Sequence, residues 1–66
     1  MDNIEKVYDY IKYFTEEKGF PPTFFQIEEA LGIEKHEAKE AYDQLEKFGR
    51  IKVERMPSKI KITFAE

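Results

Sequence analysis

Cysteine is absent from this sequence of 66 residues, so neither a disulfide nor a thiolate metal site can form. Its absence fits a reducing compartment, and we expect a cytoplasmic location. His36 is the only histidine, and one histidine does not make a zinc site, so we expect neither a metal nor another cofactor. The chain shows no basic segment followed by an apolar run, and no apolar run approaches the ~20 residues that cross a bilayer. We therefore expect no signal peptide and no membrane partner.

Glycine is also scarce, with three residues in the chain, and no glycine-rich phosphate-binding loop is present. Ser58 lies far in sequence from His36, and no cysteine nucleophile exists. Carboxylates are numerous, but they form no recognisable catalytic pattern. The sequence therefore predicts a protein that is not an enzyme.

Charge is abundant but unevenly distributed along the chain. Residues 1–49 hold 6 basic and 12 acidic residues, a net charge of −6, whereas residues 50–66 hold 5 basic and 2 acidic residues, a net charge of +3. The aromatic content of 15% argues against disorder. The length suits one small domain, residues 1–66.

Three stretches have the apolar spacing of amphipathic helices, at about residues 3–18, 24–31 and 35–48. Asp2 or Asn3 can cap the first helix. Thr23 is placed to cap the second, with Gln26 three residues later as its capping-box partner. A glycine, which commonly ends a helix, follows each stretch at Gly19, Gly32 and Gly49.

The third helix has a weak cap candidate, Glu34, and a clear apolar stripe. The residues predicted to point inward are Ala38, Ala41, Tyr42, Leu45 and Phe48. The second helix is expected to bury Ile27 and Leu31.

Beyond Gly49 the apolar period changes to two. Apolar residues alternate with polar ones in two runs, Ile51 and Val53 in the first and Ile60, Ile62 and Phe64 in the second. This pattern predicts a β-hairpin of strands at about 50–55 and 59–64, with one face on the helices. The fold class is α+β and mostly helical.

The stretch "GFPPTFFQIEEALGI" closely resembles the entry to the second helix in the DNA-binding domain of the LexA repressor. The shared residues are Gly19, Pro21, Pro22, Thr23, Ile27, Leu31, Gly32 and Ile33. The stretch "LEKFGRIKV" resembles the passage from the recognition helix to the wing of such domains. The resemblance covers about residues 4–64 and implies a winged helix-turn-helix fold. It does not extend to the self-cleaving, dimerising domain of the repressor, so no autoproteolysis is expected.

Two positions depart from the family pattern. Glu28 stands where a small residue, most often alanine, usually faces the third helix. The turn into the third helix, Glu34-Lys35-His36, is one residue shorter than in some LexA sequences.

The resemblance implies that the third helix lies in the major groove of DNA and that its first turns reach base edges. The outward candidates are Lys35, His36, Glu37, Lys39 and Glu40, followed by Asp43. Lysine can donate to guanine, and glutamate can accept from the N4 amine of cytosine. The alternative is a solvated helix face, laced by ionic pairs at i,i+4 spacing such as Lys39–Asp43.

The predicted hairpin lies in the segment with a net positive charge, residues 50–66. Arg55, Lys59 and Lys61 are the candidates for contact with phosphates, and the amides at the helix start near Thr23 can add another such contact. The alternative is that these lysines only protect an edge strand from aggregation.

Two function hypotheses follow. The first is a sequence-specific, double-stranded DNA-binding transcriptional regulator that acts as a homodimer on a palindromic site. The second is a protein-interaction module that binds a protein partner through its acidic helical face or through an apolar patch of Tyr13, Phe24 and Phe25. Core filling is the default for either phenylalanine taken singly, and one of them is expected to pack on Phe14 or Phe20.

Overall fold

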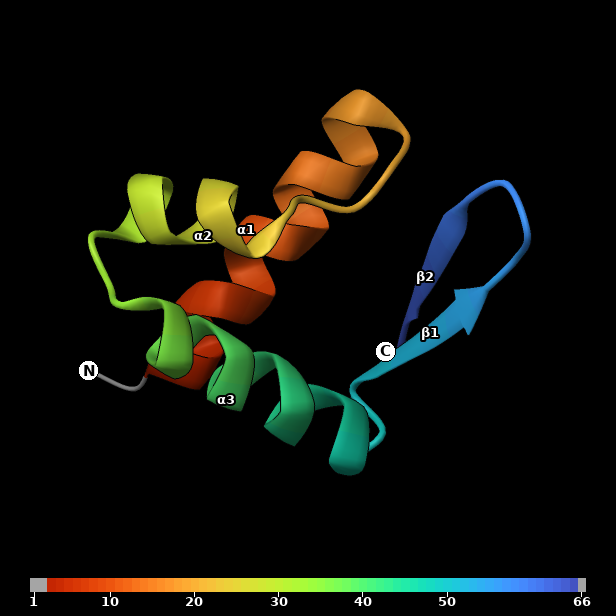
Figure 1. Cartoon of the computed structure of the whole chain (residues 1–66). Helices are drawn as coiled ribbons and strands as arrows, with labels where there is room; N and C mark the ends of the chain where they lie inside the picture. Colours follow the sequence, from red (N-terminus) through yellow and green to blue (C-terminus); the bar gives the residue numbers. More distant parts are fainter. Residues whose placement is uncertain (1–2, 66) are drawn as a thin grey trace.

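The computed structural model describes residues 3–65 as three helices followed by an antiparallel hairpin (Figure 1). The helices are α1 (Asn3–Lys18), α2 (Phe24–Leu31) and α3 (Lys35–Lys47), and the strands are β1 (Ile51–Arg55) and β2 (Ile60–Phe64). The predicted α+β fold is confirmed, and every boundary lies within one residue of its expected place. Asp2, one of the two predicted caps of α1, lies outside the described residues, and Asn3 is already helical.

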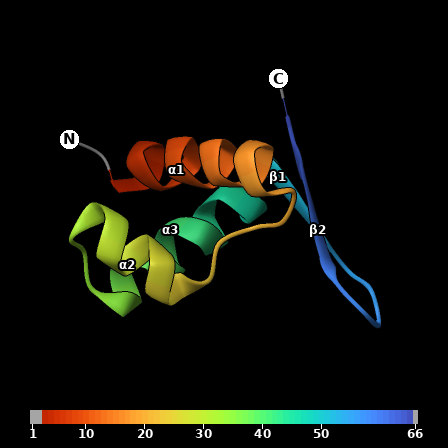
Figure 2. The same cartoon turned by 90° about the horizontal axis from the view of Figure 1, so that it is seen from above.

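The core lies where the three helices meet the inner face of the hairpin. Figure 2 shows α1 along one side of the molecule, α2 and α3 beside it, and the hairpin across one end. The buried side chains are Val7, Ile11, Phe14, Ile27, Ala38, Ala41, Leu45, Ile51 and Ile62. Among residues 3–65 no polar residue is buried as a whole, but the hydroxyl oxygen of Thr15 is buried and has no hydrogen-bond partner. None of the described helices has both the length and the apolar character needed to span a bilayer.

The start of α2 is fixed by the predicted capping box. The Thr23 hydroxyl accepts a hydrogen bond from the Gln26 backbone amide at 3.2 Å, and the Gln26 side chain accepts one from the Thr23 amide at 2.8 Å. Both bonds satisfy amide groups that the first turn of a helix leaves without a partner. Local sequence alone therefore determines where this eight-residue helix begins.

The end of α3 differs from expectation at Phe48. The Arg50 amide donates to the Leu45 carbonyl at 2.9 Å, and Gly49 adopts a φ of +76°, so the chain reverses directly after the helix. Phe48 is consequently 65% exposed, and its prediction as an inward residue is wrong. Ile51, the first residue of β1, is buried in its place.

The strands pair from Ile51 with Phe64 to Arg55 with Ile60. Because residues directly opposite each other share a face, the inner face holds Ile51, Val53, Ile62 and Phe64, and these four residues pack on the core. Ile60 was predicted on this buried face, but it is 47% exposed. It belongs to the last pair of the ladder, at the end farthest from α3, where the hairpin extends beyond the helices (Figure 1).

Candidate nucleic-acid interface

The first turns of α3 present charged side chains to solvent. Lys35, His36, Lys39 and Glu40 are exposed. Within residues 3–65, Lys35, Lys39 and Glu40 make no hydrogen bond or ion pair, and the i,i+4 pair between Lys39 and Asp43 is not formed. The ends of these side chains are therefore free to meet a ligand.

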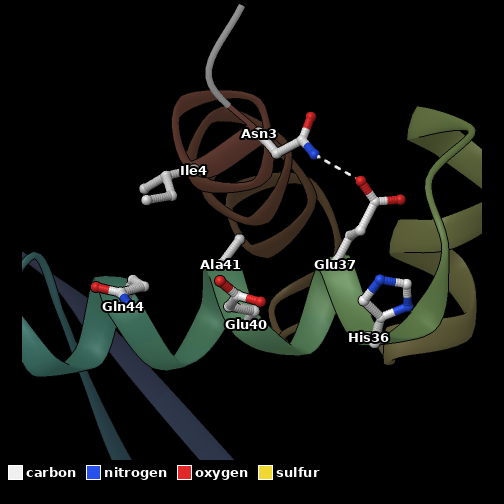
Figure 3. Close-up of a pocket in the computed structure, with 7 residues that line it drawn as sticks. All are labelled: Asn3, Ile4, His36, Glu37, Glu40, Ala41 and Gln44. Carbon is white, nitrogen blue, oxygen red and sulfur yellow. Dashed lines mark hydrogen bonds between the residues drawn. The ribbon is translucent and has the colours of Figure 1, made fainter.

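Glu37 behaves differently from its neighbours (Figure 3). Its Oε1 accepts a hydrogen bond from the Glu34 backbone amide at 3.0 Å, and its Oε2 accepts one from the Asn3 side-chain amide at 3.1 Å. The first bond caps α3, and the second joins the start of α1 to the start of α3. Glu37 is half-buried, and both of its carboxylate oxygens are engaged within the protein. Glu34, expected to be a weak cap, thus begins α3 with help from Glu37.

A shallow groove of about 390 Å³ separates the starts of α1 and α3. Figure 3 shows Asn3 and Ile4 on the α1 side of this groove, with Glu37, Glu40 and Gln44 on the α3 side. The groove contains two carboxylates and no lysine or arginine, so it does not suit a phosphate. The cations of α3 lie outside it.

His36 lies beside Glu34, with its Nδ1 3.3 Å from a carboxylate oxygen. Potential ligand atoms of Glu34, His36 and Glu37 lie within 4.8 Å of one another. The first two side chains are exposed, and Glu37 already accepts two hydrogen bonds. The arrangement serves helix capping, and the expectation of no metal stays a prediction.

The hairpin carries the second group of predicted contacts. Arg55, Lys59 and Lys61 are all exposed. Arg55 and Thr23 line one groove of about 320 Å³ between the start of α2 and the hairpin, although they are 32 positions apart in sequence. Lys59 and Lys61 line a neighbouring groove against the end of α1.

Tyr42 of α3 and Arg55 of β1 line the same groove, so Arg55 lies close to the helices. Burial raises the pKa of the Tyr42 phenol above its usual value, while the positive charge of Arg55 acts to lower that pKa. The Arg55 guanidinium therefore lies close enough to α3 to affect its electrostatics.

Arg50 is also basic, but its side chain contacts α1 instead of pointing freely into solvent like the other cations of the hairpin. Its Nη1 lies 2.6 Å from a carboxylate oxygen of Glu5, and its guanidinium lies 4.3 Å from the centroid of the Tyr8 ring. The hydrogen bond to Glu5 is the main cause that raises the pKa of Arg50. These contacts attach the base of the hairpin to α1. No local sequence pattern predicts this contact, because 45 positions separate the two charges.

The predicted aromatic patch is only partly exposed. Phe25 and Tyr13 are 67% and 63% exposed, whereas Phe24 is half-buried with its ring 5.4 Å from that of Tyr42. The expectation that Phe24 or Phe25 packs on Phe14 or Phe20 is not met, because Phe14 and Phe20 pack on each other.

The predicted contacts thus form two groups at opposite ends of α3. Figure 1 shows that α3 begins far from the hairpin and ends beside it. With 13 residues, α3 is about 20 Å long, so roughly that distance separates Lys35 at its start from the base of the hairpin.

Comparison with known proteins agrees with this architecture. A family model described as the LexA DNA binding domain matches residues 3–60, which include the three helices and most of the hairpin. Neither the curated proteins nor the solved structures gave a match. The matched model describes a DNA-binding domain and includes no peptidase, and it implies DNA as a partner. The resemblance found in the sequence is confirmed: the chain belongs to the LexA DNA-binding domain family.

Proposed function

We propose that the protein is a sequence-specific regulator of transcription that binds double-stranded DNA. In this proposal α3 enters the major groove and the hairpin contacts the phosphate backbone. The observation that carries the proposal is the set of free, exposed side chains at the start of α3. Lys35, Lys39 and Glu40 make no hydrogen bond or ion pair within residues 3–65. They offer donors for guanine and an acceptor for cytosine.

The spacing of the two groups supports this arrangement. The base of the hairpin lies about 20 Å from the start of α3. Half a turn of B-DNA measures about 17 Å, since a full turn is about 34 Å. A hairpin at this spacing can reach the backbone beside the groove that α3 occupies. His36 and Glu37 complete the first turn, with Glu37 in a positioning role.

Dimerisation on a palindromic site is part of the same proposal. One copy presents two proposed base-contacting cations, Lys35 and Lys39, and three proposed phosphate-contacting cations, Arg55, Lys59 and Lys61. Two copies on related half-sites double the base contacts and the phosphate contacts. We also propose a cytoplasmic location and no catalytic activity.

The salt dependence of binding tests the proposal. Binding of the protein to a mixed-sequence duplex is measured by fluorescence anisotropy at several salt concentrations. The three side-chain phosphate contacts of Arg55, Lys59 and Lys61 predict a slope of about −2.7 for the logarithm of the association constant against the logarithm of salt concentration. Replacement of Lys59 and Lys61 by glutamine should reduce the magnitude of that slope by about 2.

A matched control removes the same charge from α1. Replacement of Lys6 and Lys12 by glutamine should leave the slope unchanged, because α1 is not among the predicted contacts. No detectable duplex binding at low salt would refute the proposed function. Equal loss in both double variants would refute the assignment of the hairpin as the phosphate contact. Selection from a random duplex pool then tests whether binding is sequence-specific.

The exposure of Phe25 and Tyr13 favours one alternative, a module that binds a protein partner. Replacement of Phe25 by serine should abolish capture of a stoichiometric partner if the alternative holds, and it should leave duplex binding unchanged. The acidic helical face is tested by partner capture alone, because Glu40 is also a proposed base contact. A partner that stays bound after replacement of Glu40 by lysine would count against this face.

A further inference from the structure

The tip of the hairpin carries apolar side chains where a water-facing turn usually does not. Two-residue hairpin turns in water favour asparagine, aspartate and glycine. Here the tip reads Met56-Pro57-Ser58-Lys59, all of it exposed, and Met56 is 38% exposed. Together with the exposed Ile60, the tip offers three apolar side chains to solvent.

The tip is narrow and held by its own backbone. The Met56 amide donates to the Lys59 carbonyl at 2.8 Å, and the Lys59 amide donates to the Met56 carbonyl at 3.4 Å. Pro57 and Ser58 are therefore the two central residues of the turn, and the Pro57 ring fixes its own φ angle. The apolar side chains are presented on a short, stiff support.

Cations flank the tip on both faces of the hairpin. Arg55 lies opposite Ile60 in the strand register, and their side chains share one face of the hairpin. Met56 lies opposite Lys59 at the next position, so their side chains share the other face. Each face of the tip thus combines one apolar side chain with one cation. This pairing suits a groove in which an apolar side chain can enter between stacked bases while cations meet the phosphates of the two walls.

The shape of the hairpin restricts which groove it can enter. The minor groove of B-DNA is about 6 Å wide. The backbones of two paired strands already lie ~4.8 Å apart, and their side chains make the hairpin wider than the groove. Only the tip fits without deformation of the duplex. Figure 2 shows the tip extending past the helices on the side away from α1, where no other element blocks it.

We propose that Met56 and Pro57 enter the minor groove as an apolar wedge that opens a base step and bends the DNA. The inference rests on the proposed function. It adds a preference for certain DNA sequences that comes from how easily a base step deforms and not from contacts to base edges. Apolar wedges of this kind separate stacked bases and kink the duplex toward the major groove. Pyrimidine–purine steps such as TA and CA unstack most readily. Binding sites should therefore carry such a step beside the half-site that α3 reads.

The test uses the duplex that the protein enriches from a random pool. The bend is measured by energy transfer between dyes at the two ends of this duplex, and unstacking is followed by 2-aminopurine placed at successive flanking steps. The unaltered protein should bend the duplex and raise 2-aminopurine fluorescence at one flanking step. Replacement of that step by GC should weaken binding about fivefold or more, as one unfavourable base pair typically does.

Two variants separate the wedge from its cations. Met56→Ala should reduce the bend and the 2-aminopurine signal at saturating protein, while Lys59→Gln should weaken binding and retain the bend. Circular dichroism checks that both variants are folded, which is expected because both side chains are exposed. An unchanged bend with Met56→Ala, or an equal loss of bend with Lys59→Gln, overturns the wedge. Absence of duplex binding by the unaltered protein overturns the proposed function and the wedge together, whereas bound but unbent DNA overturns the wedge alone.

Discussion

Glu37 gives the sharpest test of how the start of α3 works, because two roles for it predict different results. Sequence pattern places it among the base-reading side chains. In the structure its carboxylate accepts one hydrogen bond from the Glu34 amide and one from the Asn3 side chain. The perturbation is Glu37→Ala, which removes both bonds and leaves the rest of α3 intact.

The expected loss of stability follows from these two bonds. Loss of a helix cap costs about 1 kcal/mol, and a partly exposed hydrogen bond contributes about 0.5–1.5 kcal/mol net. Glu37→Ala should therefore lower the free energy of unfolding by about 1.5–2.5 kcal/mol. A domain of this length has a total of about 3–10 kcal/mol, so the change is easily measured.

Urea denaturation followed by far-ultraviolet circular dichroism measures this loss. A double-mutant cycle with Asn3→Ala should give a coupling energy of at least about 0.5 kcal/mol, because the two side chains are in contact. Glu37→Gln is the matched control. Glutamine also serves at this position of a capping box, so most of the stability should be retained.

A base-reading role predicts the opposite pattern. In that case Glu37→Gln should shift the selected base from cytosine toward adenine, and Glu37→Ala should change stability by less than about 0.5 kcal/mol. That outcome would refute the positioning role derived from the two hydrogen bonds.

Three further predictions concern the fold and its titration. Leu45→Ala should lower the free energy of unfolding by about 2–5 kcal/mol in urea denaturation, because Leu45 is fully buried. Gly32→Ala should cost about 1 kcal/mol in the same assay, since φ is +65° while no atom lies within 4 Å of an added Cβ. Burial raises the pKa of Tyr42 in the folded state, so its contribution to stability is complete below the unfolded value of about 10 and is lost as pH rises through the folded pKa. Arg55→Met should raise the pKa of Tyr42 further, as read by NMR titration of its ring.

Local signals explain which features of the fold could be predicted from the sequence. The capping-box partners Thr23 and Gln26 are three positions apart, and a glycine follows closely after the end of each helix. Both signals are local, so the sequence predicts these boundaries correctly. The predicted burial of Phe48 and Ile60 is wrong. Periodicity indicates the face of the helix or strand on which a residue lies, but it does not indicate how far along that face the packed neighbours extend. Both lie at the limit of an element, Phe48 at the end of α3 and Ile60 at the far end of the hairpin.

The candidate site shows the same division between local and distant contacts. Exposure of Lys39 and Glu40 follows from their position on the outward face of α3, and sequence periodicity was sufficient to predict it. The engagement of Glu37 by Asn3 and of Arg50 by Glu5 joins positions 34 and 45 residues apart, and no pattern within a helix encodes it. A charged residue can therefore be predicted to lie on the surface, whereas its availability for DNA depends on the packing of distant elements.

The charge distribution supports the proposed dimer. Residues 1–49 have a net charge of −6, and in the proposed complex the attraction to DNA comes from two cations at the start of α3 and three in the hairpin. A salt slope of about −2.7 means that affinity falls about 40-fold between 50 and 200 mM salt. One copy, with acidic α1 and α2 behind its contact surface, would bind only weakly at physiological salt. In the proposed dimer a second copy on the adjoining half-site adds a second set of base and phosphate contacts. On this proposal the acidic helices suppress binding to unrelated DNA, and specific binding requires both half-sites.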